Sequence, residues 1–364
     1  MIRVVLLVAA VLLSAAQRTQ TPPPTQTPPA QTPVQTPVPT PIPTPAQPFE
    51  EFLAGLRADA LKLGIRQATL DAALTGLEPN MVVVARDRAQ PELTQSLDDY
   101  VAARLTPTRI QSARTLLDTH APLLARIEEA YGISPPMMVS IWGLESNFGA
   151  FTGTYQTIQS LATLAWDGRR KLFRDELLAA LKIVDEGKAT AADLKGSWAG
   201  AMGQPQFMPS SYLTTAVDFD TDGRADIWTS LPDVFGSMAN YLKTAGWRKA
   251  ERWGREIRVS KDAIAKIDKT VPMRTAGCRS IREMTVARPL SQWADLGVTL
   301  ADGRPLPPTD EAASLVRGQA RYFLVYRNFE ALLAYNCSSA YAVSVGLLAD
   351  QVMPPQRPAP RRGR

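Results

Sequence analysis

Residues 17–48 set the strongest limit on what this chain can fold into. They consist almost entirely of Thr, Pro, Gln, Ala and Val, and 12 of the chain's 30 prolines lie between Pro22 and Pro48. Proline lacks a backbone donor and favours polyproline II, and this composition offers too few apolar side chains to build a core. We therefore predict a disordered linker at 17–48 and expect the folded part downstream of it.

The first 16 residues predict a signal peptide. Arg3 precedes an apolar run from Val4 to Leu13, and small residues follow before Gln17, which is the layout of a secretory signal. The run is shorter than the roughly 20 residues that span a bilayer, and no later stretch is long or apolar enough to do so. We expect an exported protein, either released by cleavage or attached by an uncleaved signal.

The two cysteines, Cys278 and Cys337, lie far from this apolar run. Neither can serve as a lipoprotein cysteine, because that residue directly follows the signal. In an oxidising compartment the two could pair and close a loop of about 60 residues, which would contribute about 3 to 4 kcal/mol by the chain-entropy estimate. Two buried free thiols are the alternative.

The pattern from Phe49 onward is mainly helical. Phe52, Leu56 and Ala60 recur at a helical period, and Gly64 supplies a stop. Further helices are predicted at residues 67–75, 93–104, 107–117, 121–131, 135–147, 169–186, 233–245 and 338–351. The sequence therefore predicts a mainly α fold.

A second kind of pattern interrupts the helices between about 254 and 330. Short β-branched or alternating pieces occur at 255–259 and 321–326, separated by Pro and Gly turns. We predict one helical domain at 49–352 that carries a small β-containing, mixed α/β insertion at 254–330. The Pro- and Arg-rich tail at 353–364 is expected to be disordered.

The composition excludes several kinds of active site. His120 is the only histidine, and with two cysteines the chain has too few ligands for a zinc site of Cys and His residues. His120 lies just ahead of a predicted helix start, where capping is its simplest role. A Ser-His-Asp hydrolase would depend on His120 and lacks the G-x-S-x-G pattern. The glycine-rich 196–203 stretch has no phosphate-loop ending. The net charge of +5 suits an anionic polymer, but no nucleic-acid motif accompanies it, and we expect no nucleic-acid partner.

Carboxylate chemistry remains, and Glu145 is the candidate. The segment 134–149 has Ser134 as a possible N-cap, Pro135 at the first helical position and Gly149 at the exit, which predicts a short helix. Glu145 shares a face with Met138, Ile141 and Trp142, so we expect it to be desolvated. Burial and the negative end of the helix dipole would both raise its pKa. A buried structural Glu paired with an Arg is the alternative.

Four motifs then bring in a resemblance. They are the Gly143–Gly149 segment GLESNFG, the 196–212 segment GSWAGAMGQPQFMPSSY, the 218–223 segment DFDTDG and the 335–342 segment YNCSSAYA. In this order they resemble the membrane-bound lytic murein transglycosylase B family, over roughly residues 50–352. The second motif is long and specific.

The resemblance implies a lysozyme-like helical fold and a periplasmic enzyme that acts on peptidoglycan glycan strands. It implies cleavage of the β-1,4 bond between N-acetylmuramic acid and N-acetylglucosamine, with a 1,6-anhydromuramic acid end and no cofactor for catalysis. Glu145 matches the catalytic acid, which then acts as the base, so no second carboxylate is required. The positions that match substrate-binding residues are Ser197, Gln206, Tyr241, Tyr335, Asn336 and Tyr341.

Two other functions stay open at this point. A lysozyme-like muramidase would use water in place of the muramoyl C6 hydroxyl to complete the reaction. A non-catalytic scaffold would grip glycan strands and dock partners through its Pro-rich arm, which could also bind cell-wall synthesis proteins. Each substrate-binding position also has a purely structural reading, such as a tight turn at 196–212 or core packing for Tyr241.

The aspartates at 218–222 predict a possible structural calcium site. Asp218, Asp220 and Asp222 occupy positions 1, 3 and 5 of a calcium loop, but position 12 is Thr229 in place of the usual Glu. The resemblance implies a variant loop with a late ligand, for which Asp233 is the candidate. A solvated acidic turn, with Asp233 as the N-cap of the next helix, is the alternative.

Overall fold

The computed structural model describes residues 47–89 and 95–353. The predicted signal peptide at 1–16 lies outside the described residues. So do the predicted linker, apart from its last two residues, and the predicted tail, apart from residue 353.

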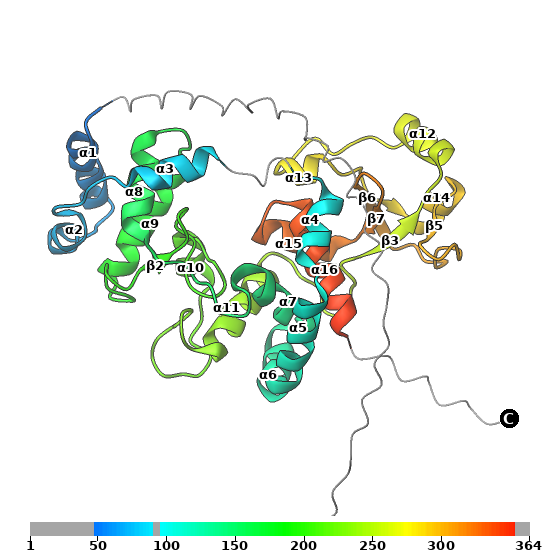
Figure 1. Ribbon diagram of the computed structural model, residues 1–364, viewed down its shortest axis with the longest axis horizontal. Helices are drawn as coiled ribbons and strands as arrows, with labels where there is room; N and C mark the ends of the chain where they lie inside the picture. Colours follow the sequence, from blue (N-terminus) through cyan, green and yellow to red (C-terminus); the bar gives the residue numbers. More distant parts are fainter. Residues whose placement is uncertain (1–46, 90–94, 354–364) are drawn as a thin grey trace, which may run out of the picture. The chain divides into compact units, whose positions relative to one another are not determined.

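Helices make up most of the described chain (Figure 1). Those before the sheet are α1 Phe49–Lys62, α2 Gln67–Leu74, α3 Met81–Arg88, α4 Leu97–Arg104, α5 Pro107–Thr119, α6 Ala121–Tyr131, α7 Pro135–Ser146, α8 Thr157–Asp167, α9 Leu172–Asp185, α10 Pro209–Thr215 and α11 Leu231–Thr244. Those within or after it are α12 Lys261–Thr270, α13 Arg279–Arg282, α14 Leu290–Asp295, α15 Arg327–Tyr335 and α16 Ser339–Val352. The prediction of a mainly α fold is confirmed.

Two apolar clusters hold the helical part together. One surrounds α7 and α16 and includes buried side chains such as Met138, Phe235 and Leu348. The other joins α1, α2, α8 and α9 through residues such as Leu56 and Leu177. Burial of such side chains contributes about 1.5 to 3 kcal/mol each. Tyr335 packs against both clusters, so a predicted site residue lies where the two cores meet.

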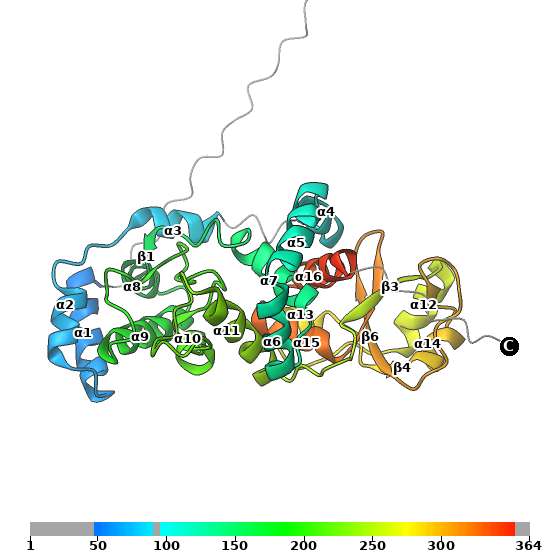
Figure 2. The same cartoon turned by 90° about the horizontal axis from the view of Figure 1, so that it is seen from below.

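The insertion is a five-stranded antiparallel sheet with its own core (Figures 1 and 2). The strand order is β4-β6-β7-β3-β5. The central strands pair in register, with Arg255 opposite Leu324 and Leu315 opposite Leu324 on the other side. Trp293 of α14 and Ile267 of α12 are fully buried against the sheet. The strands are β3 Gly254–Arg258, β4 Arg288–Pro289, β5 Thr299–Leu300, β6 Ala312–Arg317 and β7 Tyr322–Val325; β1 Tyr155–Gln156 and β2 Lys195–Gly196 form a separate pair.

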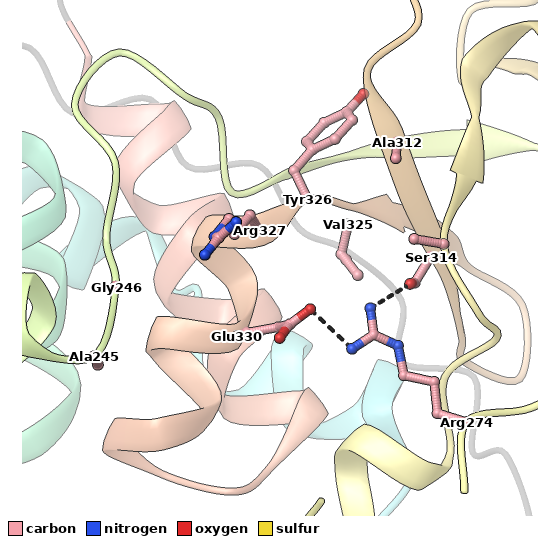
Figure 3. A pocket seen from close by; sticks show the side chains of 10 residues that line it. Ala245, Gly246, Arg274, Ala312, Ser314, Val325, Tyr326, Arg327 and Glu330 are labelled. Atoms are coloured by element: carbon pink, nitrogen blue, oxygen red, sulfur yellow. Dashed lines mark hydrogen bonds and ion pairs between the residues drawn. The ribbon is translucent and has the colours of Figure 1, made fainter. Parts of the chain in front are cut away.

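An ion pair links the insertion to α15. Arg274 donates to the Glu330 carboxylate at 2.8 Å and to Ser314 Oγ at 2.9 Å (Figure 3). These side chains line a cavity of about 330 Å³ between α15 and β6. None of the predicted site residues lines this cavity, which lies where the insertion meets α15.

Several predicted helix bounds are corrected. The helix expected at 93–104 begins at Leu97, where the Ser96 hydroxyl accepts from Asp99 N, and residues 93 and 94 lie outside the described part. The helix expected at 169–186 begins only at Leu172. The helix expected at 233–245 begins earlier, at Leu231, because Ser230 caps it. The prediction from sequence missed α3, α8 and α10, and it did not resolve α12, α13, α14 and α15. The helix α10 is too short to show a period, and the other four lie within or overlap the segment that was predicted only as mixed α/β.

Cys278 and Cys337 form a disulfide, so the free-thiol alternative is wrong. The bridge ties α13 to the turn between α15 and α16, and Ser280 adds to it by donating to Cys337 O at 3.2 Å and accepting from Ser339 N at 3.1 Å. Among the described helices, none is by itself long and apolar enough to cross a membrane. Taken together, α15 and α16 reach the required length and apolar composition, but they are bent by 117° at the break between them.

A side chain at Gly346 should destabilise the protein because Trp253 packs directly against this position. A Cβ at Gly346 would lie 2.2 Å from the Trp253 ring, where α16 meets the start of β3. A Cβ at the exposed Gly55 of α1 would meet nothing within 4 Å. We expect Gly346→Ala to lower the free energy of unfolding by about 1 to 3 kcal/mol through overpacking. Gly55→Ala should raise it by about 0.5 to 1 kcal/mol. Urea denaturation of both variants tests this, and equal effects would contradict it.

Candidate active site

The helix that carries Glu145 is held on almost every side. Residues 136–143 of α7 are all buried, and α16, α5, α6 and α11 pack against the helix. Glu145 itself lies in the last turn and is half-buried, so the expected desolvation is only partial. A rigid helix thus presents one carboxyl group at its end.

The exit of α7 is tightly folded. Asn147, Phe148 and Gly149 all have positive φ, at 50°, 60° and 80°. Asn147 caps the end of the helix, in agreement with the predicted bounds 135–147, and Gly149 follows in the exit as predicted. The Ser134 side chain makes no capping hydrogen bond. The Phe148 ring folds back over Gly143, where a Cβ would lie 2.5 Å from it. Positive φ at non-glycine residues costs free energy and often accompanies functional sites.

Two tyrosines lie close enough to Glu145 to feel its charge. Burial, and then the negative charge of Glu145, raise the pKa of Tyr341 and of Tyr335 well above the usual range. The Tyr341 hydroxyl interacts with the Glu145 side chain. Both hydroxyls therefore stay neutral beside the carboxylate at neutral pH.

The predicted Tyr241 and Tyr335 form an aromatic cluster with Phe207. The Tyr241 and Tyr335 ring centroids are 4.8 Å apart, and Phe207 lies within 5.8 Å of each. Tyr241 Oη donates to Ala334 O and Tyr335 Oη to Pro205 O, both at 2.7 Å. Because backbone carbonyls already occupy the two hydroxyls, the half-buried ring faces are what these residues can offer to a sugar.

Ser197 and Gln206 shape one loop. Ser197 Oγ accepts from Ala199 N and Ala201 N, and Gln206 Nε2 donates to Gly203 O at 2.8 Å and to Thr152 O at 3.1 Å. Both side chains are half-buried. The second of these bonds ties the loop to the segment that follows Glu145.

Asn336 is exposed, beside Tyr335 and Cys337 at the turn that the disulfide braces. Electrostatic interactions thus join Glu145 to Tyr335 and Tyr341, and a ring contact and a hydrogen bond join Tyr335 to Tyr241 and to the Gln206 loop. Ser197 belongs to the same loop, and Asn336 is connected through the chain alone.

Sequence reasoning gave no role to Gln204. Its side chain is only 8% exposed; Oε1 accepts from Trp142 Nε1 at 2.7 Å, and Nε2 donates to Trp228 O at 2.8 Å. Trp142 precedes Glu145 by one helical turn. The available signal was an amide between Gly203 and Pro205 within the glycine-rich motif, but its partners lie 62 and 24 residues away.

His120 packs where capping was expected. It stands between α5 and α6, but its side chain makes no capping hydrogen bond. The imidazole lies 5.9 Å from the Trp142 ring and 6.2 Å from the Phe235 ring, measured between centroids. His120 therefore packs against Trp142 of α7 and Phe235 of α11.

The four predicted metal ligands come together. One carboxylate oxygen from each of Asp218, Asp220, Asp222 and Asp233 lies within 4.8 Å of the others. Asp233 is fully buried, and it accepts from Phe219 N at 2.7 Å and from Asp226 N at 2.8 Å. Ser230 is the N-cap of α11, so the alternative that Asp233 caps this helix is wrong.

The family is decided by comparison with known sequences. A family model described as a transglycosylase SLT domain matches residues 48–350. The chain belongs to this family. It is 33% identical, over 254 residues, to membrane-bound lytic murein transglycosylase B of Escherichia coli strain K12; the match covers 68% of this chain and 65% of that protein.

Solved structures of transglycosylases are similar to 84% of this chain. SltB3 from Pseudomonas aeruginosa in complex with NAG-anhNAM-pentapeptide is 41% identical, with a TM-score of 0.74 over 84% of this chain and 80% of that chain. Escherichia coli Slt35 in complex with calcium is 29% identical, with a TM-score of 0.67 over 84% and 92%. The predicted fold, helical with a small β insertion, is confirmed as that of these transglycosylases.

The raised pKa values of Tyr335 and Tyr341 predict alkaline sensitivity. Between the unfolded pKa near 10 and the higher folded values, the unfolded chain binds fewer protons, so stability is fully present below about pH 10 and falls as pH rises further. Urea denaturation at pH 8, 9.5 and 11 should show this fall. Tyr341→Phe should make the fall shallower, and an unchanged slope would contradict the assignment.

Proposed function

We propose that this protein is a peptidoglycan lytic transglycosylase, with Glu145 as the group that moves protons. The observation that supports this most is the position of Glu145, at the end of the buried helix α7 and beside Tyr335 and Tyr341, in a chain that matches the transglycosylase family over 48–350. The chain spans 65% of the length of its curated relative, so activity and substrate are inferred for this chain.

The reaction needs one carboxyl group in two protonation states. Protonated Glu145 donates to the glycosidic oxygen, and the bond between that oxygen and the muramoyl C1 breaks. The muramoyl C6 hydroxyl then attacks C1 and returns its proton to Glu145, which leaves a 1,6-anhydro end and restores the acid. Proton donation by a positioned acid contributes about 10² to 10⁴-fold to the rate.

The neighbouring residues would bind and orient the glycan. Ser197, Gln206 and Asn336 offer hydroxyl and amide groups for N-acetyl groups, and the rings of Tyr241 and Tyr335 offer stacking faces. Tyr341, buried and neutral, would stabilise the Glu145 carboxylate after proton transfer. A structural relative was solved with NAG-anhNAM-pentapeptide, which supports an anhydromuramic product over the reducing end that a muramidase would leave.

We also propose that the aspartate loop binds calcium. Opposite ligands of a calcium ion lie about 4.6 to 5.2 Å apart, since each Ca–O distance is about 2.3 to 2.6 Å, and the four carboxylate oxygens fit this spacing. Asp218, Asp220, Asp222 and Asp233 would hold the ion, whose double positive charge would offset half of their four negative charges. The calcium complex of Slt35 supports this.

The location and arrangement of the chain complete the proposal. We place the enzyme in the periplasm, with a signal at 1–16 and a linker at 17–48 that lets the domain at 49–352 reach the wall. The Pro-rich arm would be available to cell-wall synthesis proteins. The insertion at 254–330 would brace the Tyr335 turn through Arg274 and the disulfide.

Glu145→Gln should abolish glycan cleavage. The amide keeps the shape of the side chain but cannot donate a proton, so we expect release of muropeptides from purified peptidoglycan to fall by about 10² to 10⁴-fold. Mass spectrometry of the products measures this, and the wild type should release anhydromuramic ends. Glu129→Gln, an exposed change of the same charge on α6, is the matched control.

Three results would change the conclusion. Reducing ends in the wild-type digest would indicate a hydrolase. Full activity of a folded Glu145→Gln variant would remove Glu145 from the mechanism. No release by the folded wild type would favour a glycan-binding scaffold.

Calcium should raise the thermal stability of the wild type. Binding to the folded state alone stabilises by about 2.7 kcal/mol when calcium is present at 100 times Kd. Asp220→Asn, which removes one carboxylate of the cluster, should weaken binding in calorimetry and reduce the rise in Tm. Asp310→Asn, in an exposed turn of the insertion, should change neither. Equal calcium responses in the two variants would count against the site.

A further inference from the structure

We infer that Gln204 is a positioning residue that couples the aspartate loop to the helix of Glu145. The inference rests on the proposed roles of Glu145 and of calcium. Gln204 is buried between these two sites, and each of its polar side-chain atoms is committed to a different one. No other described residue is bonded in this way to both Trp142 and the loop.

The first half of the connection runs from the ion ligands to Gln204. Buried Asp233 accepts from Asp226 N at 2.8 Å, and Asp226 Oδ1 accepts from Trp228 N at 2.8 Å. The backbone oxygens beside this point accept from Gln204, which binds Trp228 O through Nε2 at 2.8 Å and Ile227 O through its backbone N at 2.9 Å. A change in the order of the aspartate cluster therefore reaches both amide groups of Gln204.

The second half runs from Gln204 to Glu145. Gln204 Oε1 accepts from the Trp142 indole at 2.7 Å inside the core. Trp142 is one turn before Glu145, and Trp142 O accepts from Phe148 N at 3.2 Å where the helix ends. A buried hydrogen bond resists displacement, because a separated donor and acceptor would each lack a partner. Movement of Gln204 thus shifts the turn that carries the carboxyl group.

The space around Gln204 makes the connection stiff. A Cβ on Gly149 would lie 2.5 Å from Gln204 Oε1, so the amide is in close contact with the tight exit of α7 as well as with Trp142. Gly203 is equally confined, since a Cβ there would lie 2.6 Å from Ile227 O. Closely packed interiors transmit small displacements because they cannot absorb them.

The indole N–H signal of Trp142 gives a readout that does not depend on catalysis. We would record ¹⁵N–¹H spectra of the full chain labelled at tryptophan, first with chelator and then with calcium, and assign the signal by its loss in Trp142→Phe. In the wild type, calcium should shift the Trp142 signal. Glu145→Gln should show the same shift, so failure of the catalytic proposal would not be mistaken for failure of the coupling.

Gln204→Met should break the connection. The thioether fills a similar volume but accepts weakly and cannot donate, so the Trp142 signal should move upfield and stop responding to calcium. On peptidoglycan, kcat should fall by about 10 to 100-fold, because a displacement near 1 Å can cost 10²-fold, while KM stays within about twofold. Gln159→Met removes a comparable side-chain hydrogen bond, from Gln159 Nε2 to Glu78 O, and should change neither the Trp142 signal nor kcat.

Three outcomes would overturn the inference. The inference is overturned if calcium does not shift the Trp142 signal of the wild type, whether or not it shifts the Trp228 signal. It is also overturned if calcium still shifts the Trp142 signal of a folded Gln204→Met variant. A folded Gln204→Met variant with the kcat of the wild type would overturn it as well. If Gln204→Met does not fold, the wild-type titration decides alone, because it requires no substitution at Gln204.

Discussion

The hydrogen bond between Trp142 and Gln204 is the interaction on which the proposed active site most depends. It lies inside the protein and joins two segments 62 residues apart: the helix of Glu145 and the glycine-rich loop. Each partner leaves a buried polar group if the other is removed, at a cost of about 1 to 3 kcal/mol. The bond therefore fixes the angle at which α7 presents its carboxyl group to the loop of Ser197 and Gln206.

Other contacts take their place around this connection. The tight exit of α7 turns the chain toward Thr152, which Gln206 binds, and Phe148 closes over Gly143. On the opposite side, the disulfide and Ser280 fix the turn that presents Tyr335 and Asn336. The site is thus built from three segments distant in sequence, each held by bonds that do not involve substrate. Such preorganisation is what acid catalysis requires, because the proton donor must be positioned before the substrate arrives.

Glu145 and the four clustered aspartates differ in their surroundings. Glu145 lies in the last turn of a helix, near neutral tyrosines, where a carboxyl group can change protonation state. The aspartates at 218–233 crowd four carboxylates within 4.8 Å, an arrangement that suits a cation and is unfavourable without one. Gln204 lies between them, so the chain could use ion binding to set the geometry of an acid that never touches the ion.

The sequence by itself determined the mainly α class, the site of the β insertion, and Glu145 as the candidate acid, because helical period, β-branched pieces and the flanking Pro residues are local patterns. Tertiary structure decided what those patterns could not: that Cys278 pairs with Cys337, that Ser230 and not Asp233 caps α11, and that Gln204 joins Trp142 to Trp228. These depend on contacts between segments far apart in the chain. A single side chain gives no local sign of such a partner, since its hydrogen bonds are chosen by packing.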